Sequence, residues 1–235
     1  MSPSATVIVD YDAGNLRSVQ RALAEVGVTA TLSSHPADVV NAQRIVFPGV
    51  GAAGSAMRTL RKLGLDAALK HAIASGVPTL GICLGLQISL EHSEEGDTPT
   101  LALLPGVVRR FRLDDPRLKI PHMGWNEVRV VQPHPVLAGL VPGDECYFVH
   151  GYYPDPTRVE DVLAIANYER DFVCSLGRGN YVGTQFHAEK SGRVGLDLLA
   201  RFARWDGKFE HQQSDKSRND LVRAEVAGAQ AKRPC

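Results

Sequence analysis

A cysteine between two glycines is the residue of this sequence best suited to covalent chemistry. Cys83 lies in Gly81-Ile82-Cys83-Leu84-Gly85, after the apolar run 77–80 and before the apolar segment 84–90. This layout is typical of a nucleophile at a sharp strand-to-helix turn, where small flanking residues let the chain bend tightly. The N-terminal N–H groups of the following helix would favour a thiolate. The alternative is a buried cysteine that packs as a small hydrophobic side chain.

A cysteine nucleophile needs a base, and His187 is the histidine best placed to serve. Glu189 follows it by two residues, and such residues of an extended segment share one face, so the carboxylate can orient the imidazole. His150 also ends a strand-like run, whereas His122 is expected in a loop. The alternative for His187 and Glu189 is an exposed strand end with two solvated side chains. The remaining histidines have contexts typical of surface residues: His35, His71, His92, His134 and His211.

Attack by a thiolate also needs donors for the oxyanion that forms. One donor at such a turn is the backbone N–H of the residue after the nucleophile, here Leu84. Pro48-Gly49-Val50-Gly51 follows another strand-like run, and its glycines allow the peptide between Val50 and Gly51 to be oriented toward a ligand. Without the cysteine turn, this segment would be interpreted as a plain turn. It lacks the G-x-x-x-x-G-K-[ST] pattern of a phosphate loop.

Short β-branched runs alternate with longer amphipathic runs in the first half of the chain. This alternation predicts a parallel sheet covered by helices, with functional loops at the carboxyl ends of the strands. Loops 10–15 and 48–54 and Cys83 all follow predicted strands, so we expect them to converge on one edge of the sheet. The predicted strands are 6–9, 44–47 and 77–80, and the predicted helices are 16–26 and 57–75.

The second half of the chain has little helix and is expected to form an antiparallel or mixed extension. A last helix over 193–205 has apolar residues suited to packing on the sheet. Residues 1–207 are therefore expected to form one domain, and the polar segment 208–235 a disordered, dispensable tail. The strand-like runs, separated by Pro, Gly and Asp turns, are 107–111, 127–131, 146–149, 162–166, 172–176 and 181–186.

Composition excludes several classes of protein. The 26 Lys and Arg residues balance the 26 Asp and Glu residues, so nothing in the net charge favours nucleic acid or an anionic membrane as a partner. The four cysteines are widely spaced, which argues against a zinc site or a disulfide framework and favours a reducing cytoplasm. No apolar run approaches the roughly 20 residues that span a bilayer. We expect a soluble cytoplasmic protein without a metal or cofactor.

Three motifs, in chain order, resemble those of the class I (triad) glutamine amidotransferases. They are the oxyanion motif at 48–51, the nucleophile motif at 81–87 and the His/Glu motif at 185–191. The resemblance implies the flavodoxin-like α/β fold of that family, with a central, mostly parallel sheet flanked by helices and an antiparallel or mixed extension. It covers the chain from about the first predicted strand to the last predicted helix.

The resemblance also implies a reaction, the hydrolysis of glutamine to glutamate and ammonia. Cys83 would form a thioester with the glutamine side chain, His187 would protonate the leaving ammonia and then activate water, and Glu189 would orient His187. Leu84, Val50 and Gly51 match the positions that hold the oxyanion. Gly49, Gln87 and Glu95 match positions that bind glutamine.

Further motifs narrow the resemblance to the glutaminase subunits of imidazole glycerol phosphate synthases: Asp10-Tyr11 with residues 14–19, 121–126 and 147–150. The resemblance implies a heterodimer with a (β/α)8-barrel cyclase. The cyclase would use the ammonia to form imidazole glycerol phosphate and aminoimidazole carboxamide ribotide in histidine biosynthesis. Asn15, Tyr147 and Lys190 match interface or gating positions. Alternatively, Met123 and Trp125 of the second motif belong to the core.

Three residues depart from the family pattern. Ala188 stands where proline is common, which removes a restriction on the backbone beside His187. Asp12 stands where glycine is frequent, and Gly151 replaces a usual serine or threonine.

The alternatives to the predicted function are a glutaminase that feeds another synthase, as in pyridoxal phosphate synthesis, and a cysteine hydrolase or catalytically silent subunit of the same fold.

Overall fold

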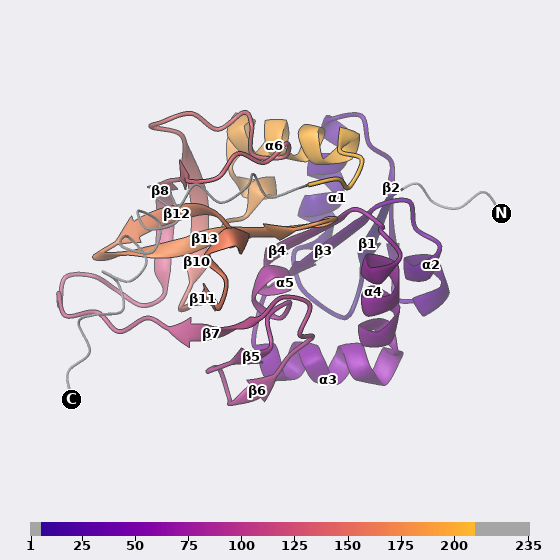
Figure 1. Ribbon diagram of the computed structural model, residues 1–235, viewed down its shortest axis with the longest axis horizontal. Helices are drawn as coiled ribbons and strands as arrows, with labels where there is room; N and C mark the ends of the chain where they lie inside the picture. Colours follow the sequence, from indigo (N-terminus) through magenta and orange to yellow (C-terminus); the bar gives the residue numbers. More distant parts are fainter. Residues whose placement is uncertain (1–5, 210–235) are drawn as a thin grey trace.

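An eight-stranded sheet runs through the centre of the computed structural model, which describes residues 6–209 (Figure 1). The strand order is β2-β1-β3-β4-β14-β13-β12-β9. From β2 to β14 each strand is parallel to the next in this order, as predicted for β1, β3 and β4. The strand β2 was not predicted, and β14, whose residues were expected in the antiparallel or mixed extension, joins the parallel part through β4. These parallel strands are β1 (Thr6–Val9), β2 (Ala30–Ser33), β3 (Ile45–Gly49), β4 (Thr79–Cys83) and β14 (Tyr181–Thr184).

The remaining strands of the large sheet are antiparallel and come from the second half of the chain. They are β13 (Arg170–Arg178), β12 (Val162–Tyr168) and β9 (Arg129–Val130). Two smaller sheets adjoin them. One pairs β8 (His122–Glu127) with β10 (Glu145–His150), and the other contains β11 (Tyr152–Pro156), β7 (Gly106–Arg110), β5 (His92–Ser93) and β6 (Thr98–Pro99). The predicted antiparallel or mixed extension is therefore confirmed.

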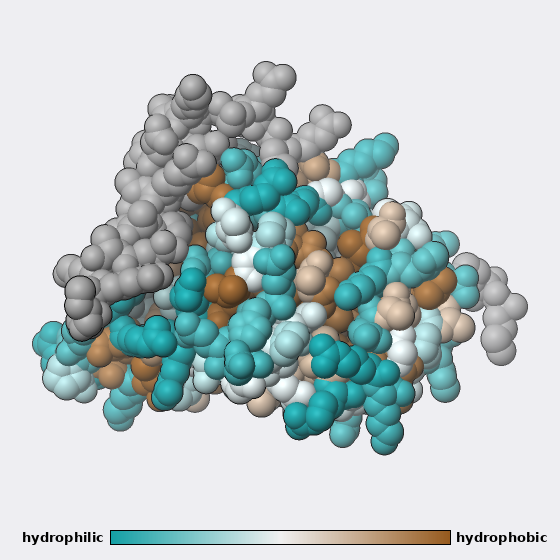
Figure 2. Space-filling model, turned by 60° about the horizontal axis from the view of Figure 1, so that its bottom comes forward, coloured by the Kyte–Doolittle hydropathy of each residue, from teal (hydrophilic) through white to brown (hydrophobic). Residues whose placement is uncertain are grey.

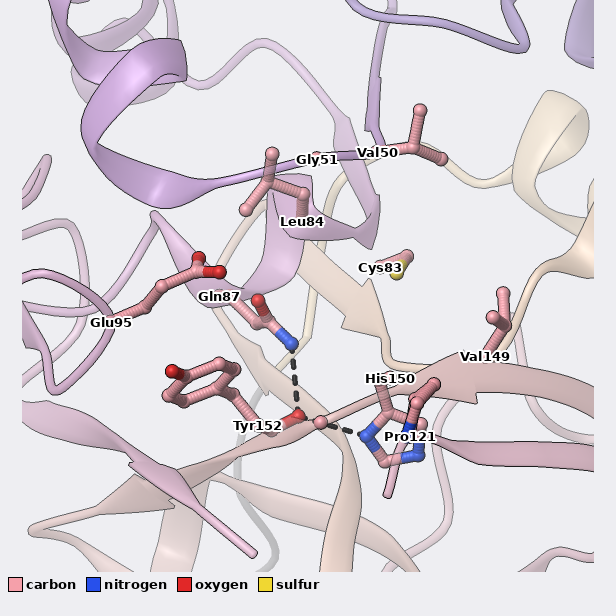
Figure 3. A pocket seen from close by; sticks show the side chains of 11 residues that line it. Val50, Gly51, Cys83, Leu84, Gln87, Glu95, Pro121, Val149, His150 and Tyr152 are labelled. Atoms are coloured by element: carbon pink, nitrogen blue, oxygen red, sulfur yellow. Dashed lines mark hydrogen bonds between the residues drawn. The ribbon is translucent and has the colours of Figure 1, made fainter. Parts of the chain in front are cut away.

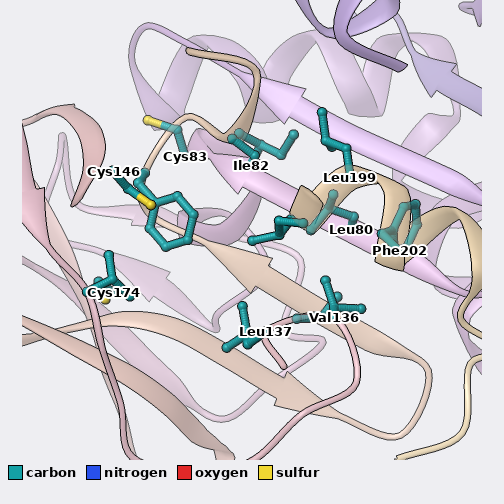
Figure 4. Packing of buried hydrophobic residues seen from close by; sticks show 14 of the residues in the cluster. Leu80, Ile82, Cys83, Val136, Leu137, Cys146, Cys174, Leu199 and Phe202 are labelled. Atoms are coloured by element: carbon teal, nitrogen blue, oxygen red, sulfur yellow. The ribbon is translucent and has the colours of Figure 1, made fainter. Parts of the chain in front are cut away.

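Helices cover both faces of the parallel part. Apolar residues of α1 (Leu16–Glu25) and α6 (Gly192–Arg204) share one buried cluster with β1, β3 and β4, where Leu199 and Phe202 pack near Leu80 and Ile82 (Figure 4). The other face is covered by α2 (Pro36–Val40), α3 (Ala53–Leu63) and α4 (Leu65–Ala74). A four-residue helix, α5 (Leu84–Gln87), and the 3-10 turns η1 (Val159–Asp161) and η2 (Ala188–Lys190) complete the elements.

Two of the sequence-based expectations for elements are wrong. The single helix expected over 57–75 is two helices, because Gly64 adopts a left-handed conformation with φ of 70° and ends α3. His122 does not lie in a loop but begins β8, paired with His150 of β10. The hydropathy pattern concealed this strand because the polar His122 is buried, whereas Met123 and Trp125 point outward with 64% and 53% of their surface exposed. Those two residues are thus not core residues.

The predicted boundary between the domain and the tail lies at the last described residues. Lys208 and Phe209, assigned to the tail from sequence, contact the domain, since Trp205 Nε1 donates to the Lys208 carbonyl and the Phe209 ring lies 4.5 Å from that of His134. His134 is itself buried rather than on the surface. The rest of the predicted tail, 210–235, lies outside the described residues.

Hydrophilic side chains are mixed with smaller apolar areas over the face of the molecule shown in Figure 2. Between residues 6 and 209, no helix has both the length and the apolar character needed to cross a membrane. Cys83, Cys146 and Cys174 are all buried free thiols.

Candidate active site

Cys83 stands at a strained turn between β4 and α5. Its φ of 53° and ψ of −106° are unusual for a residue with a side chain, as expected for a nucleophile held at a sharp turn. Gly85 is needed there because a Cβ on it would lie 1.8 Å from the carbonyl oxygen of Phe47 in β3. Gly81 is needed because a Cβ would lie 2.2 Å from the Tyr181 hydroxyl. The tight turn predicted from the flanking glycines is therefore present, although α5 is only one turn long.

His187 and Glu189 lie together directly after β14. Nδ1 of His187 is 2.8 Å from Oε1 of Glu189, and the two side chains are 2% and 0% exposed, so the pair is not a solvated strand end. The His187 backbone is fixed on both sides, because its N–H donates to the Tyr147 carbonyl and its carbonyl accepts a hydrogen bond from Ser191 Oγ. Glu189 Oε1 also accepts a hydrogen bond from Asn15 Nδ2. Asn15 thus belongs to the surroundings of the dyad.

The charges around His187 favour its protonated form. Burial alone would lower the pKa of His187. The neighbouring Cys83 sulfur and the Glu189 carboxylate have the larger, opposite effect and raise the pKa to about 10. Nε2 of His187 makes no hydrogen bond to any residue between 6 and 209. That nitrogen is therefore left to exchange a proton with a reacting group.

The glycine loop between β3 and α3 is held at both ends. The Tyr11 hydroxyl donates to the Pro48 carbonyl at 2.9 Å, and the Ala53 N–H donates to Glu95 Oε2 at 2.7 Å. Between these anchors Gly51 has φ of 98°, a conformation that favours glycine. The peptide that was expected to supply an oxyanion donor is the part of the loop between the anchors.

A cavity of about 400 Å³ opens in front of Cys83. Figure 3 shows Cys83, Gln87 and Glu95 around it, with Val50 and Gly51 on one side and β10 and β11 residues on the other. The sequence reasoning assigned Val50, Gly51, Cys83, Leu84, Gln87 and Glu95 to the site, and all of them line this cavity. It did not assign the other lining residues, Pro121, Val149, His150, Gly151 and Tyr152.

Gln87 lines the cavity, and its side-chain amide is held by two hydrogen bonds. Its Nε2 donates to the Tyr152 carbonyl at 3.0 Å and to Gln185 Oε1 at 3.1 Å (Figure 3 shows the first of these bonds). Gln185 is fully buried, and its Nε2 lies 3.6 Å from Cys83 Sγ. Sequence reasoning missed Gln185, although a polar residue two positions before His187 in an extended segment faces the same side.

The residues predicted at an interface lie beside the dyad and not inside the cavity. Lys190 Nζ lies 5.8 Å from the centre of the Tyr147 ring, and the Trp125 ring lies 6.1 Å from the same ring. Trp125 and Lys190 are exposed, whereas Tyr147 is partly buried. Gly49, predicted to bind glutamine, lies at the end of β3 opposite Cys83, where a Cβ would meet the Tyr11 hydroxyl.

Comparison with known proteins gives one family. Residues 7–204 match the model of the family described as glutamine amidotransferase class-I. The chain is 49% identical over 202 residues to the imidazole glycerol phosphate synthase subunit HisH of Desulfovibrio desulfuricans, covering 83% of this chain and 92% of that protein. It is 46% identical over 199 residues to the HisH subunit of Methanosarcina acetivorans, covering 83% and 96% of the two chains.

Solved structures of low sequence identity share the fold. A structure of PurLQS from Thermotoga maritima aligns with a TM-score of 0.66 at 17% identity and covers 85% of this chain and 97% of its own. The glutaminase domain of CTPS from Trypanosoma brucei, solved with bound acivicin, aligns with a TM-score of 0.61 at 16% identity over 90% of this chain and 98% of its own. The central, mostly parallel sheet flanked by helices is thus the fold predicted from sequence.

Proposed function

The chain belongs to the class-I glutamine amidotransferases, and within them to the HisH subunits of imidazole glycerol phosphate synthase, and we propose that Cys83, His187 and Glu189 carry its glutaminase reaction. The observation that carries this assignment is the buried His187–Glu189 pair at the strand end beside the strained Cys83. In this reaction L-glutamine is hydrolysed to L-glutamate and ammonia.

The first half of the reaction forms a thioester. Cys83 Sγ attacks the side-chain amide carbon of glutamine, and Nε2 of His187 gives a proton to the departing ammonia. The raised pKa of His187 supports this role, because it keeps the imidazolium available at neutral pH. In the second half, neutral His187 takes a proton from water as the water attacks the thioester, which releases glutamate.

The oxyanion of both tetrahedral intermediates is held by backbone donors. Leu84 N–H follows the nucleophile, and a second N–H comes from the segment containing Val50 and Gly51. Tyr11 and Glu95 fix the ends of that segment, so a change in the orientation of one or two peptides is enough to aim the donor.

The cavity in front of Cys83 takes the glutamine. Gln87 and Glu95 line it together with the nucleophile, and Gly49 lies at the adjacent strand end. Both hydrogen bonds of the Gln87 side chain to residues between 6 and 209 use Nε2, which leaves Oε1 to accept from the substrate. The Glu95 carboxylate attracts the α-ammonium group of glutamine.

The ammonia passes to a cyclase subunit, for which we propose a (β/α)8 barrel that makes imidazole glycerol phosphate and aminoimidazole carboxamide ribotide. Tyr147 and Lys190, with the exposed Trp125, form the surface beside the dyad that meets this partner. Asn15 links the same region to Glu189. The buried free thiols suit the reducing conditions of the cytoplasm, where we place the complex.

Labelling with an electrophilic glutamine analogue tests the assignment of the nucleophile. We expect peptide mapping to find the label on Cys83 and not on Cys146 or Cys174. Burial raises the pKa of Cys146 to about 12 and that of Cys174 well above its usual value, so both remain thiols at neutral pH. Excess glutamine should protect Cys83. Label on Cys146 or Cys174 with Cys83 unmodified would contradict the proposal.

A further inference from the structure

A buried glutamine lies against the nucleophile and belongs to none of the assigned parts of the site. Gln185 is 0% exposed, does not line the cavity, and places Nε2 3.6 Å from Cys83 Sγ. We propose that Gln185 is a further catalytic residue, which donates a hydrogen bond to the Cys83 thiolate and stabilises it before attack on the substrate. This inference deepens the proposed glutaminase function and depends on Cys83 being its nucleophile.

The orientation of the Gln185 amide is fixed by its neighbour. Gln87 Nε2 donates to the Tyr152 carbonyl, which can only accept, and the same nitrogen lies 3.1 Å from the Gln185 side chain. An amide nitrogen has no acceptor to offer, so the atom of Gln185 that faces it is Oε1. The NH2 group of Gln185 is therefore the end that faces the sulfur.

Two buried histidines, of which His150 lines the cavity, extend this chain of hydrogen bonds to β8. His150 Nδ1 lies 2.8 Å from the Tyr152 carbonyl and must donate to it, so His150 Nε2 accepts from His122 Nδ1 at 3.1 Å. His122 Nε2 in turn accepts from Asn126 Nδ2 at 3.3 Å. Each imidazole is thereby held as one neutral tautomer, in agreement with the burial that lowers the pKa of both rings.

This chain of hydrogen bonds gives Gln185 a rigid support. Asn126, His122 and His150 belong to the paired strands β8 and β10, and Gln185 itself is held by its backbone N–H, which donates to the Cys174 carbonyl at 2.8 Å. A donor that is already oriented needs no rearrangement when the sulfur becomes charged, which is the condition for effective electrostatic stabilisation.

The hydrogen bond from Gln185 favours the thiolate form of Cys83, because the accepting Sγ then carries a negative charge. A hydrogen bond to an ionised group is stronger than one to the neutral form, so a donor aimed at Sγ favours the thiolate. Gln185 precedes His187 by two residues at the same strand end. The amide and the imidazolium thus act on one sulfur from one segment, the amide as a fixed dipole and the imidazolium as the proton carrier.

The pH dependence of Cys83 alkylation by iodoacetamide, followed by peptide mass mapping of the full chain, tests this role. Two variants separate the donor from the acceptor. Gln185→Glu keeps an oxygen for Gln87 Nε2 but removes the NH2 group at the sulfur, and Gln185→Met removes both. The matched control is Gln20→Met on α1, which also removes an amide donor, here to the Ala30 carbonyl, away from the site.

We expect the alkylation midpoint of Cys83 to rise by about one pH unit in Gln185→Met, and by at least as much in Gln185→Glu, where a carboxylate faces the thiolate. The control should keep the wild-type midpoint. With the cyclase subunit present, Gln185→Glu should lower kcat for glutamine about tenfold while KM stays near its wild-type value. If Gln185 only supported the cavity structurally, Gln185→Glu would instead change KM.

An unchanged midpoint in Gln185→Glu would overturn the role of Gln185. So would a midpoint that shifts equally in Gln20→Met. Thermal unfolding of each variant shows whether it is folded, and if Gln185→Met is not, the better matched Gln185→Glu decides the result. Because alkylation needs no glutamine, a shifted midpoint together with an absence of glutamine hydrolysis by the wild-type complex would contradict the proposed function and not the hydrogen bond.

Discussion

Glu189 is the residue on which two parts of the site depend. Its side chain is completely buried, and its Oε1 accepts hydrogen bonds from both His187 Nδ1 and Asn15 Nδ2. A buried carboxylate is costly unless it is paired, and here the pair is an imidazole whose protonated form the carboxylate stabilises. Asn15 has φ of 73°, so the left-handed turn before α1 brings its amide to this oxygen. Glu189 therefore orients His187 and, together with the Cys83 sulfur, favours its protonated form.

Removing the charge of Glu189 should lower the pKa of His187. In Glu189→Gln we expect the imidazole to titrate well below the value of about 10 in the wild type, while Glu25→Gln, an exposed change on α1, leaves it unaltered. NMR titration of the His187 ring measures this directly. An unshifted His187 titration in Glu189→Gln would show that the carboxylate does not control the base.

The same shift predicts a pH dependence of stability. The folded-state pKa of His187 lies above its unfolded value, so its contribution is complete below about pH 6.5 and is lost as the pH rises toward 10. The free energy of unfolding should fall from pH 7 to pH 9 more steeply in the wild type than in Glu189→Gln. Urea unfolding at the two pH values compares the slopes.

The three residues proposed as the triad could be selected from sequence because of their types and their spacing. Cys83 lies between glycines, and Glu189 lies two residues after His187. No role was predicted for Gln185, although it begins the motif at 185–191, because a neutral amide is neither a usual base nor a usual nucleophile. The contact of Asn15 with Glu189 joins residues 174 positions apart, and no local pattern can place them together.

At the scale of elements, the nucleophile depends on how closely β3 and α5 approach each other. Gly85 faces the Phe47 carbonyl, and its missing side chain lets α5 begin directly after Cys83. Helix propensity alone would favour alanine over glycine in a helix by about 1 kcal/mol. The 1.8 Å approach of a Cβ to a backbone oxygen is far more costly, so packing overrides propensity at this position.

Gly85→Ala should therefore destabilise the protein by about 3 kcal/mol and abolish labelling of Cys83. The control is Gly54→Ala in α3, where a Cβ would come within 3.3 Å of only one side-chain atom, Thr98 Oγ1. We expect the control to change the free energy of unfolding by less than about 1 kcal/mol. Equal stability of the two variants in urea unfolding would mean that α5 can shift away from β3.

Elements of the first half were predicted more accurately than those of the second. The parallel strands follow continuous apolar runs, which are recognisable because both of their faces are buried. β8 was missed because His122 points inward while Met123 and Trp125 point outward, the reverse of the usual alternation. Its inward position follows from the buried pairing with His150, a contact made 28 residues later.

At the scale of the whole molecule, the active site lies where the two halves of the chain meet. The parallel half supplies Cys83 and the glycine loop. The strand β14 returns from the antiparallel half to pair with β4, and the segment after β14 supplies Gln185, His187 and Glu189. The exposed Trp125 beside Tyr147 lies on the outer face of the β8 and β10 pair. The surface proposed to meet the cyclase is thus carried by the strands that also hold the buried histidines.

Product formation by the complex with the cyclase subunit tests most directly whether Cys83 serves only to release ammonia from glutamine. In Cys83→Ala, glutamine-dependent formation of imidazole glycerol phosphate should fall at least about a thousandfold, because the nucleophile is gone. Formation from added ammonium salt should continue at the wild-type rate, since the cyclase then needs no glutaminase. Loss of both activities would mean that Cys83 is structural, and retention of the glutamine-dependent activity would mean that another residue is the nucleophile.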